Sequence, residues 1–157
     1  MHSISVVLPA YNEEGNIGTM VTEVLTTMQS VVPDFEIVVV DDGSRDRTAE
    51  IVRELAERYP QVRLVQHPTN WGYGAALYTG FTSATKELLF FTDSDNQFVL
   101  SEINRLLPHI DHADMVVGYR APRHDPWHRV LFGWGWSLLV TLLFGYTARD
   151  IDCAFKL

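Results

Sequence analysis

The feature that most constrains the fold is a repeated alternation between short apolar runs and segments with helical periodicity. Four apolar runs rich in β-branched and aromatic residues occupy 3–9, 35–41, 62–66 and 87–92. After the first run, Ile17, Met20, Val21, Val24, Leu25 and Met28 recur at helical spacing. Strands that alternate with helices in this way form parallel sheets covered by helices. The pattern therefore predicts an α/β protein.

The remaining elements follow from the same reading. One helix is expected to begin near Asp46 and another to span 101–109, with Asp46 and Ser101 as their caps, and a helix of small residues is expected over 72–84. A fifth strand is predicted over 115–118. With 157 residues the chain is predicted to form a single domain, 1–157. The strand-like run 151–157 stops without a turn or polar tail, which suggests truncation at the carboxyl end.

Acidic side chains follow three of the predicted strands. Glu13 follows the first strand, Asp42 the second, and Asp93 with Asp95 the fourth, while Arg120 follows the fifth. Ligands of an open parallel sheet bind beyond the carboxyl ends of its strands. Carboxylates gathered there repel one another unless a cation lies among them, and hard oxygen ligands suit Mg²⁺ or Mn²⁺. We expect a bridge from metal to diphosphate, although Asp93 and Asp95 taken alone also fit two solvated turn residues.

The motifs at these strand ends occur in a distinctive order. They read Pro9-Ala10-Tyr11-Asn12-Glu13, Asp41-Asp42-Gly43-Ser44, Asn70-Trp71-Gly72-Tyr73-Gly74 and Asp93-Ser94-Asp95. This order resembles the family 2 glycosyltransferases of GT-A fold, and among them the dolichyl- and polyprenyl-phosphate sugar transferases, over essentially the whole chain. The resemblance implies a Rossmann-like, mostly parallel sheet flanked by helices. It also implies metal-dependent, inverting transfer of a sugar from a GDP- or UDP-sugar to a lipid phosphate.

The resemblance also implies roles for individual residues. The implied nucleotide-binding residues are Pro9, Tyr11, Glu13, Asp42 and Asp93. The implied metal ligands are Asp93, Asp95 and Gln97. The implied catalytic residues are Asp95, Arg120 and Asp150. Arg120 and Arg129, from the arginine-rich segment after the fifth predicted strand, are the expected ligands of the acceptor phosphate. The segment that begins at Asp150 departs from the family pattern, because Cys153, Ala154 and Lys156 replace a serine, a glycine and an arginine.

The region after the fifth predicted strand suggests contact with a membrane. Residues 119–149 contain four arginines and one acid, and the stretch 130–148 carries no charge. That stretch has the length of a transmembrane candidate, but a span would put 150–157 across the bilayer from the other site residues. We expect a helix partly buried on the sheet and partly at the membrane interface, with a wholly buried helix as the alternative. Residues 1–118 would then bind the nucleotide sugar, and 119–157 would form an incomplete part that faces the acceptor.

Composition excludes some classes of protein and leaves the acceptor open. A net charge of -8 argues against a general nucleic-acid binder. The single cysteine excludes an internal disulfide, and no signal peptide precedes the first strand, so a cytoplasmic protein peripheral to the membrane is expected. A lipid phosphate needs no strong base, whereas a saccharide hydroxyl would need one, with Asp150 or Asp152 as candidates. The third possibility is a domain that binds nucleotide sugar without turnover.

Overall fold

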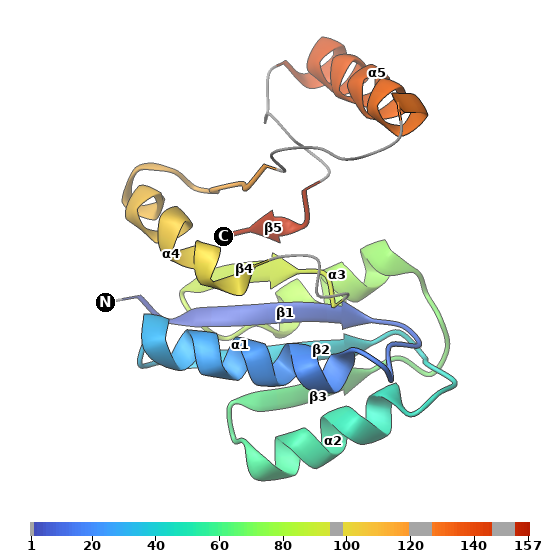
Figure 1. The fold of residues 1–157 in the computed structure, drawn as a ribbon, viewed down its shortest axis with the longest axis vertical. Coiled ribbons are helices and arrows are strands. Elements are labelled where there is room, and N and C mark those ends of the chain that lie inside the picture. The colour runs from blue at the N-terminus through green and yellow to red at the C-terminus, as the bar shows by residue number, and fades with distance from the viewer. Residues whose placement is uncertain (1, 95–98, 120–126, 146–152) are drawn as a thin grey trace.

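The structure, a computed structural model, describes residues 2–94, 99–119, 127–145 and 153–157, with the backbone alone for 127–132. A five-stranded sheet of order β3-β2-β1-β4-β5 forms its centre (Figure 1). The strands are β1 (Ile4–Ala10), β2 (Phe35–Asp41), β3 (Val62–Gln66), β4 (Leu88–Thr92) and β5 (Phe155–Lys156). The first four strands are parallel, and β5 pairs antiparallel with β4. The α/β prediction with a mostly parallel sheet is confirmed.

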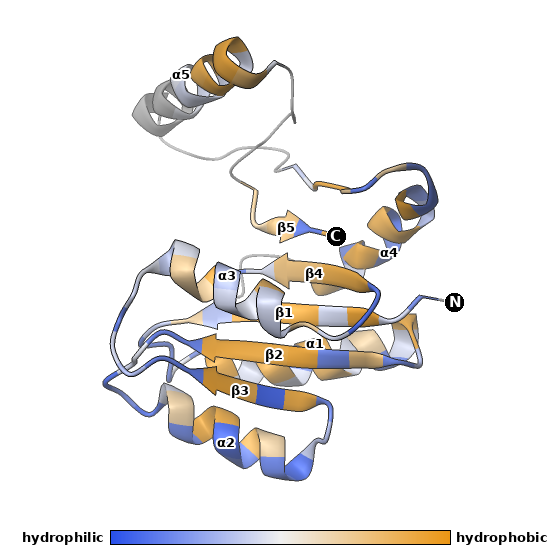
Figure 2. Ribbon diagram, turned by 180° about the vertical axis from the view of Figure 1, so that it is seen from behind, coloured by the Kyte–Doolittle hydropathy of each residue, from blue (hydrophilic) through white to orange (hydrophobic). Residues whose placement is uncertain are grey.

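Helices cover both faces of the sheet. Those beside the sheet are α1 (Ile17–Val31), α2 (Thr48–Arg58) and α3 (Tyr73–Ser83). The other helical segments are η1 (Leu100–Glu102), α4 (Ile103–Leu106), η2 (Leu107–His112) and α5 (Trp127–Phe144). Helices α1 and α2 lie on one face and α3 on the other (Figures 1 and 2). This two-sided cover explains why the strands are predominantly hydrophobic (Figure 2).

Alternation along the strands divides the core between the two faces. Val6 and Leu8 of β1 belong to the apolar cluster under α1, whereas Val7 packs in the cluster under α3. All six residues predicted for the inner side of α1 are buried. Gly80 lets α3 lie close to the sheet, because a Cβ at this position would be 2.3 Å from Cγ1 of Val7. The site at the strand ends therefore rests on a closely packed scaffold.

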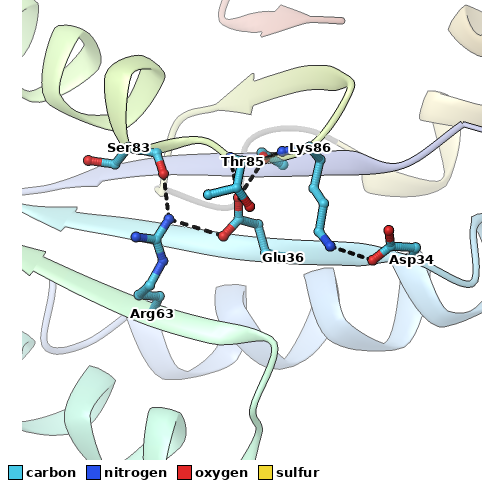
Figure 3. Close-up of polar contacts among 7 residues, drawn as sticks. Asp34, Glu36, Arg63, Ser83, Thr85 and Lys86 are labelled. Carbon is cyan, nitrogen blue, oxygen red and sulfur yellow. Dashed lines mark hydrogen bonds and ion pairs between the residues drawn. The ribbon is translucent and has the colours of Figure 1, made fainter.

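A polar network ties together the amino end of the sheet. The Glu36 carboxylate accepts hydrogen bonds from the Ser5 hydroxyl at 2.7 Å and from the Thr85 backbone N–H at 2.6 Å (Figure 3). The Arg63 guanidinium donates to the same carboxylate at 3.0 Å. Burial raises the pKa of Glu36, but the hydrogen bonds from Ser5 and Thr85 and the charge of Arg63 outweigh burial, so the pKa lies below its ordinary value. The network joins three strands to the turn before β4.

Two helix caps predicted from sequence have different outcomes. Helix α2 begins at Thr48 with Arg47 at the N-cap position, one residue after the predicted Asp46. The Asp46 carboxylate still accepts the Thr48 backbone N–H at 3.0 Å and so satisfies the first N–H of the helix. The cap predicted at Ser101 is wrong, because Ser101 lies inside η1 and its side chain makes no capping hydrogen bond. The single helix expected over 101–109 is divided into short segments, because Pro108 lacks the N–H that would continue α4.

The predicted parallel fifth strand is also wrong. Residues 115–118 instead pair antiparallel with the last residues of the chain, through a bridge between Val117 and Lys156. The backbone N–H of Val116 donates to the Leu157 carbonyl at 2.7 Å. The position beside β4 is occupied by β5, so 115–118 lies outside the sheet's parallel ladder.

The described part of α5 does not pack on the sheet as predicted. The helix stands apart from the sheet (Figure 1), and Trp134 and Trp136 are 64% and 51% exposed. Both faces of the sheet are already covered by other helices, which explains why α5 is not buried there. Among the described residues, no helix combines the length and apolar character needed to cross a membrane.

Candidate functional site

An open pocket of about 400 Å³ lies beyond the carboxyl ends of β1, β2 and β4. Its lining residues are Pro9, Ala10, Tyr11, Glu13, Asp42, Asn70, Tyr73, Ala76, Asp93 and Ser94. The parallel register, which pairs Ala10 with Asp41, brings the ends of β1 and β2 to the same level. The structure therefore brings together all five residues predicted to bind the nucleotide. Two further lining residues, Asn70 and Tyr73, belong to the glycine-rich motif at the start of α3.

Asp42 is the most deeply buried acid of the pocket, with 3% of its surface exposed. Its Oδ1 accepts hydrogen bonds from His67 Nδ1 at 2.7 Å and from the Trp71 N–H at 2.8 Å, and its Oδ2 accepts the Gly72 N–H at 2.8 Å. Burial raises the pKa of Asp42, but these hydrogen bonds and the neighbouring His67 outweigh burial and hold the pKa below its ordinary value. Asp42 is therefore a carboxylate at neutral pH.

These contacts limit what Asp42 can offer a ligand. A carboxylate has about four lone-pair sites, and three are used within the protein. One site, on Oδ2, remains for the pocket. Asp42 thus holds the segment between β3 and α3 in place and keeps a single acceptor site for the pocket.

Asp93 lies half-buried just after β4. The Tyr73 hydroxyl, at the start of α3, donates to Asp93 Oδ1 at 2.9 Å. The buried Ser94 hydroxyl donates to the Pro9 carbonyl at 2.7 Å and fastens this turn to β1. Asp93 is therefore held at the pocket by α3 and by the neighbouring strand.

The loop that carries Tyr11 and Glu13 is fixed by the loop after β2. The Asn12 N–H donates to the Ser44 hydroxyl at 2.9 Å, and the Glu13 N–H donates to the Thr48 hydroxyl at 2.8 Å. Asn12 has a φ of 55°, in the left-handed region that asparagine tolerates better than most residues. These bonds hold Tyr11, which is 42% exposed, and Glu13 at the mouth of the pocket.

The sequence profile of glycosyl transferase family 2 matches residues 5–148. The chain belongs to this family. It is 36% identical over 169 residues to a dolichyl-phosphate beta-glucosyltransferase of Trichomonas vaginalis, which covers 96% of this chain and 50% of the relative. It is 40% identical over 129 residues to an undecaprenyl-phosphate 4-deoxy-4-formamido-L-arabinose transferase of Edwardsiella ictaluri, covering 80% of this chain and 39% of the relative. The chain spans about half the length of the first curated relatives it matches.

A solved structure agrees with the family assignment. A mannosyltransferase from Pyrobaculum calidifontis, in complex with GDP-Man and Mn²⁺, superposes with a TM-score of 0.64 and 27% identity. The match covers 82% of this family 2 chain and 38% of the mannosyltransferase chain. The predicted GT-A fold and the predicted family resemblance are both confirmed.

Other predicted site residues of this family 2 chain fall outside the described residues. They are Asp95, Gln97, Arg120, Asp150 and Asp152, together with the side chain of Arg129. Within the part of the chain that the structure describes, no three His, Cys, Asp or Glu side chains are grouped to hold a metal ion. The metal and acceptor assignments remain predictions.

Sequence reasoning missed one residue that the structure connects to the pocket. His67 is buried directly behind Asp42, and its ring stacks on Trp71 with centroids 4.2 Å apart. A lone histidine after a strand carries no recognisable motif. Only the contact between the loops after β2 and β3 reveals its position.

Proposed function

We propose that this domain binds a nucleoside-diphosphate sugar in the pocket and transfers the sugar to a polyprenyl phosphate. The observation that carries the proposal is the meeting of Tyr11, Glu13, Asp42 and Asp93 in one pocket of a family 2 chain. The relatives, which include dolichyl- and undecaprenyl-phosphate sugar transferases, support a lipid phosphate as acceptor.

The pocket offers suitable groups for a nucleotide. Its volume of about 400 Å³ falls in the range of small-molecule sites. The exposed Tyr11 ring supplies a stacking surface for a base, and the Glu13 carboxylate can accept ribose hydroxyls. Asp42 would accept one N–H from the base through its remaining Oδ2 site. GDP- and UDP-sugars both remain candidate donors.

Residues of the pocket also fit a divalent metal. Asp93 supplies a hard oxygen donor beside the pocket, and the solved mannosyltransferase contains Mn²⁺ with its nucleotide sugar. Asp93 would hold Mg²⁺ or Mn²⁺ together with Asp95 and Gln97. When bound, the ion would neutralise negative charge on the leaving diphosphate. Tyr73, which donates to Asp93, would fix the orientation of that carboxylate.

The proposed reaction is a displacement at the anomeric carbon. An oxygen of the lipid phosphate forms the new bond to that carbon, while the bond to the nucleoside diphosphate breaks on the opposite side and the configuration inverts. The attacking phosphate oxygen is already anionic, so no general base is required. Arg120 and Arg129 would orient it by charge-assisted hydrogen bonds. A saccharide acceptor would instead need Asp150 or Asp152 as a base.

We also propose that 119–157 forms the acceptor side and rests on a membrane surface. The exposed Trp134 and Trp136 support this, since tryptophan favours the interface between lipid and water. The last residues of this part return to the sheet as β5. Both parts would therefore act within a single domain, with 1–118 as the donor side.

Calorimetric titration with UDP and GDP, with Mn²⁺ and with EDTA, tests the donor site. We expect binding that requires the ion and is lost in Asp93→Ala, while Asp34→Ala, far from the pocket, binds as the original chain does. Nucleotide affinity that is unchanged by EDTA would refute the metal bridge. Turnover of the bound sugar with and without polyprenyl phosphate then separates lipid transfer from binding without catalysis.

A further inference from the structure

His67 contacts three separate segments of the fold. It follows β3 directly, and its backbone N–H donates to the Asp41 carbonyl at 2.9 Å. Its side chain is 3% exposed, with Nδ1 2.7 Å from Asp42 Oδ1 and Nε2 2.9 Å from the Thr79 hydroxyl of α3. The ring also stacks on Trp71 at an interplanar angle of 28°. Both nitrogens and one face of the imidazole are thus engaged.

The charge of Asp42 fixes the tautomer of this histidine. An ionised carboxylate can only accept hydrogen bonds, so the proton between the two residues lies on His67 Nδ1. With a single ring proton on Nδ1, Nε2 accepts a hydrogen bond from the Thr79 hydroxyl. The result is a directed chain of hydrogen bonds from α3, through His67, to a carboxylate of the pocket.

The surrounding backbone leaves little room for this arrangement to shift. Gly43 follows Asp42 with a φ of 70°, and a Cβ there would lie 2.4 Å from the carbonyl carbon of Thr69. The turn after β2 therefore lies directly against the backbone after β3. The Asp42 carboxylate lies between these two loops, and its orientation depends on the donors His67, Trp71 and Gly72.

We propose that His67 is a positioning residue for nucleotide binding. It shares Oδ1 of Asp42 with the Trp71 N–H, and so directs the remaining Oδ2 site toward the pocket. The inference rests on the proposed function, because it assumes that Asp42 meets a nucleoside. The competing interpretation is that His67 only fills the space behind the pocket.

Three variants separate the donor from the packing. His67→Leu removes both ring nitrogens at similar volume. His67→Asn keeps a side-chain N–H close to the place of Nδ1. Thr79→Val removes only the partner of Nε2 and serves as the matched control. Each is measured by thermal unfolding and by titration with UDP and GDP in the presence of Mn²⁺.

We expect His67→Leu to weaken nucleotide binding by about tenfold or more, since a displaced Asp42 carboxylate would lose its charge-assisted hydrogen bond to the nucleoside. His67→Asn should recover most of that loss, and Thr79→Val should change the affinity by less than about threefold. In ¹⁵N spectra of the original chain, Nδ1 of His67 should carry a proton.

Each opposite result overturns the inference. A folded His67→Leu with the original affinity would make His67 a packing residue alone. Equal weakening in the Leu and Asn variants would exclude the donated hydrogen bond as the cause. A ring whose only proton lies on Nε2 would contradict the donated hydrogen bond to Asp42, whatever the result with nucleotide. An original chain that binds neither UDP nor GDP would overturn the proposed function, and this inference with it.

Discussion

Asp42→Asn is the substitution whose cost the structure defines most closely. An asparagine amide has one acceptor oxygen and an NH₂ group that only donates. With its oxygen at the place of Oδ1, it keeps the bonds from His67 and Trp71 but points the NH₂ at the Gly72 N–H. The flipped amide keeps the bond from the Gly72 N–H, but its NH₂ then faces the donors of His67 and Trp71. Either rotamer leaves at least one buried donor without an acceptor.

The cost can be estimated from these bonds. A buried donor left unsatisfied costs about 1–3 kcal/mol, and each bond that passes from a charged to a neutral acceptor weakens by about 1 kcal/mol. Removing a buried charge offsets part of this loss, because burial disfavours the carboxylate. Only 3% of Asp42 is exposed, so water has little access to the unpaired donor. We expect the free energy of unfolding to fall by about 2–3 kcal/mol.

Urea unfolding at pH 7, followed by circular dichroism, measures this loss. Asp34→Asn is the matched control, because the Asp34 carboxylate is 61% exposed and pairs with Lys86 at the surface. Its expected cost is below about 1 kcal/mol. The two variants should show similar dependence on urea concentration, so that the midpoints reflect stability. Equal stability of Asp42→Asn and the original chain would refute the account of Asp42 as the anchor of the segment before α3.

Three further predictions test other parts of the fold. Glu36→Gln should destabilise by about 1–3 kcal/mol at pH 7 and much less at low pH, because a pKa lowered by folding adds stability that is lost as the pH falls through it. Gly80→Ala should lower the melting temperature through a clash with Val7, whereas Gly74→Ala, with open space around it, should not. Vesicles with polyprenyl phosphate should shift the fluorescence of the α5 tryptophans. Arg129→Glu should reduce this shift without changing nucleotide affinity. Unchanged fluorescence on adding vesicles would refute the proposed membrane contact.

The parallel core and the pocket at the strand ends were predictable from the sequence because both depend on local patterns. The apolar runs of β2 and β3 are bounded by polar or turn residues, and their predicted bounds, 35–41 and 62–66, are confirmed. Once the strands are known to be parallel, their carboxyl ends must meet at one edge. That geometry alone brings Glu13, Asp42 and Asp93 together, whatever the details of the loops.

The errors concern contacts between segments that are distant in sequence. Nothing within 115–118 shows that its partner is the segment around Lys156, because an apolar run pairs equally well in either direction. Pro108, by contrast, was a visible signal against one helix over 101–109. The exposure of α5 depends on which faces of the sheet are already covered, and this is a property of the whole fold.

Asp42 anchors the segment before α3 and is also proposed to contact the nucleoside. A loss of nucleotide affinity in an Asp42 variant therefore cannot by itself show that Asp42 contacts the nucleoside. A double-mutant cycle of Asp42→Asn and His67→Leu, measured by urea unfolding, resolves the structural part. The two residues share one hydrogen bond at 2.7 Å, so the bond is removed only once, and the double variant should be less destabilised than the sum of the single variants by about 1–2 kcal/mol. Additive losses, within about 0.5 kcal/mol, would show that the pair is not coupled. Coupling between Asp42 and His67 in stability, together with weaker nucleotide binding by His67→Leu, would show that their hydrogen bond both stabilises the loop and orients the Asp42 carboxylate.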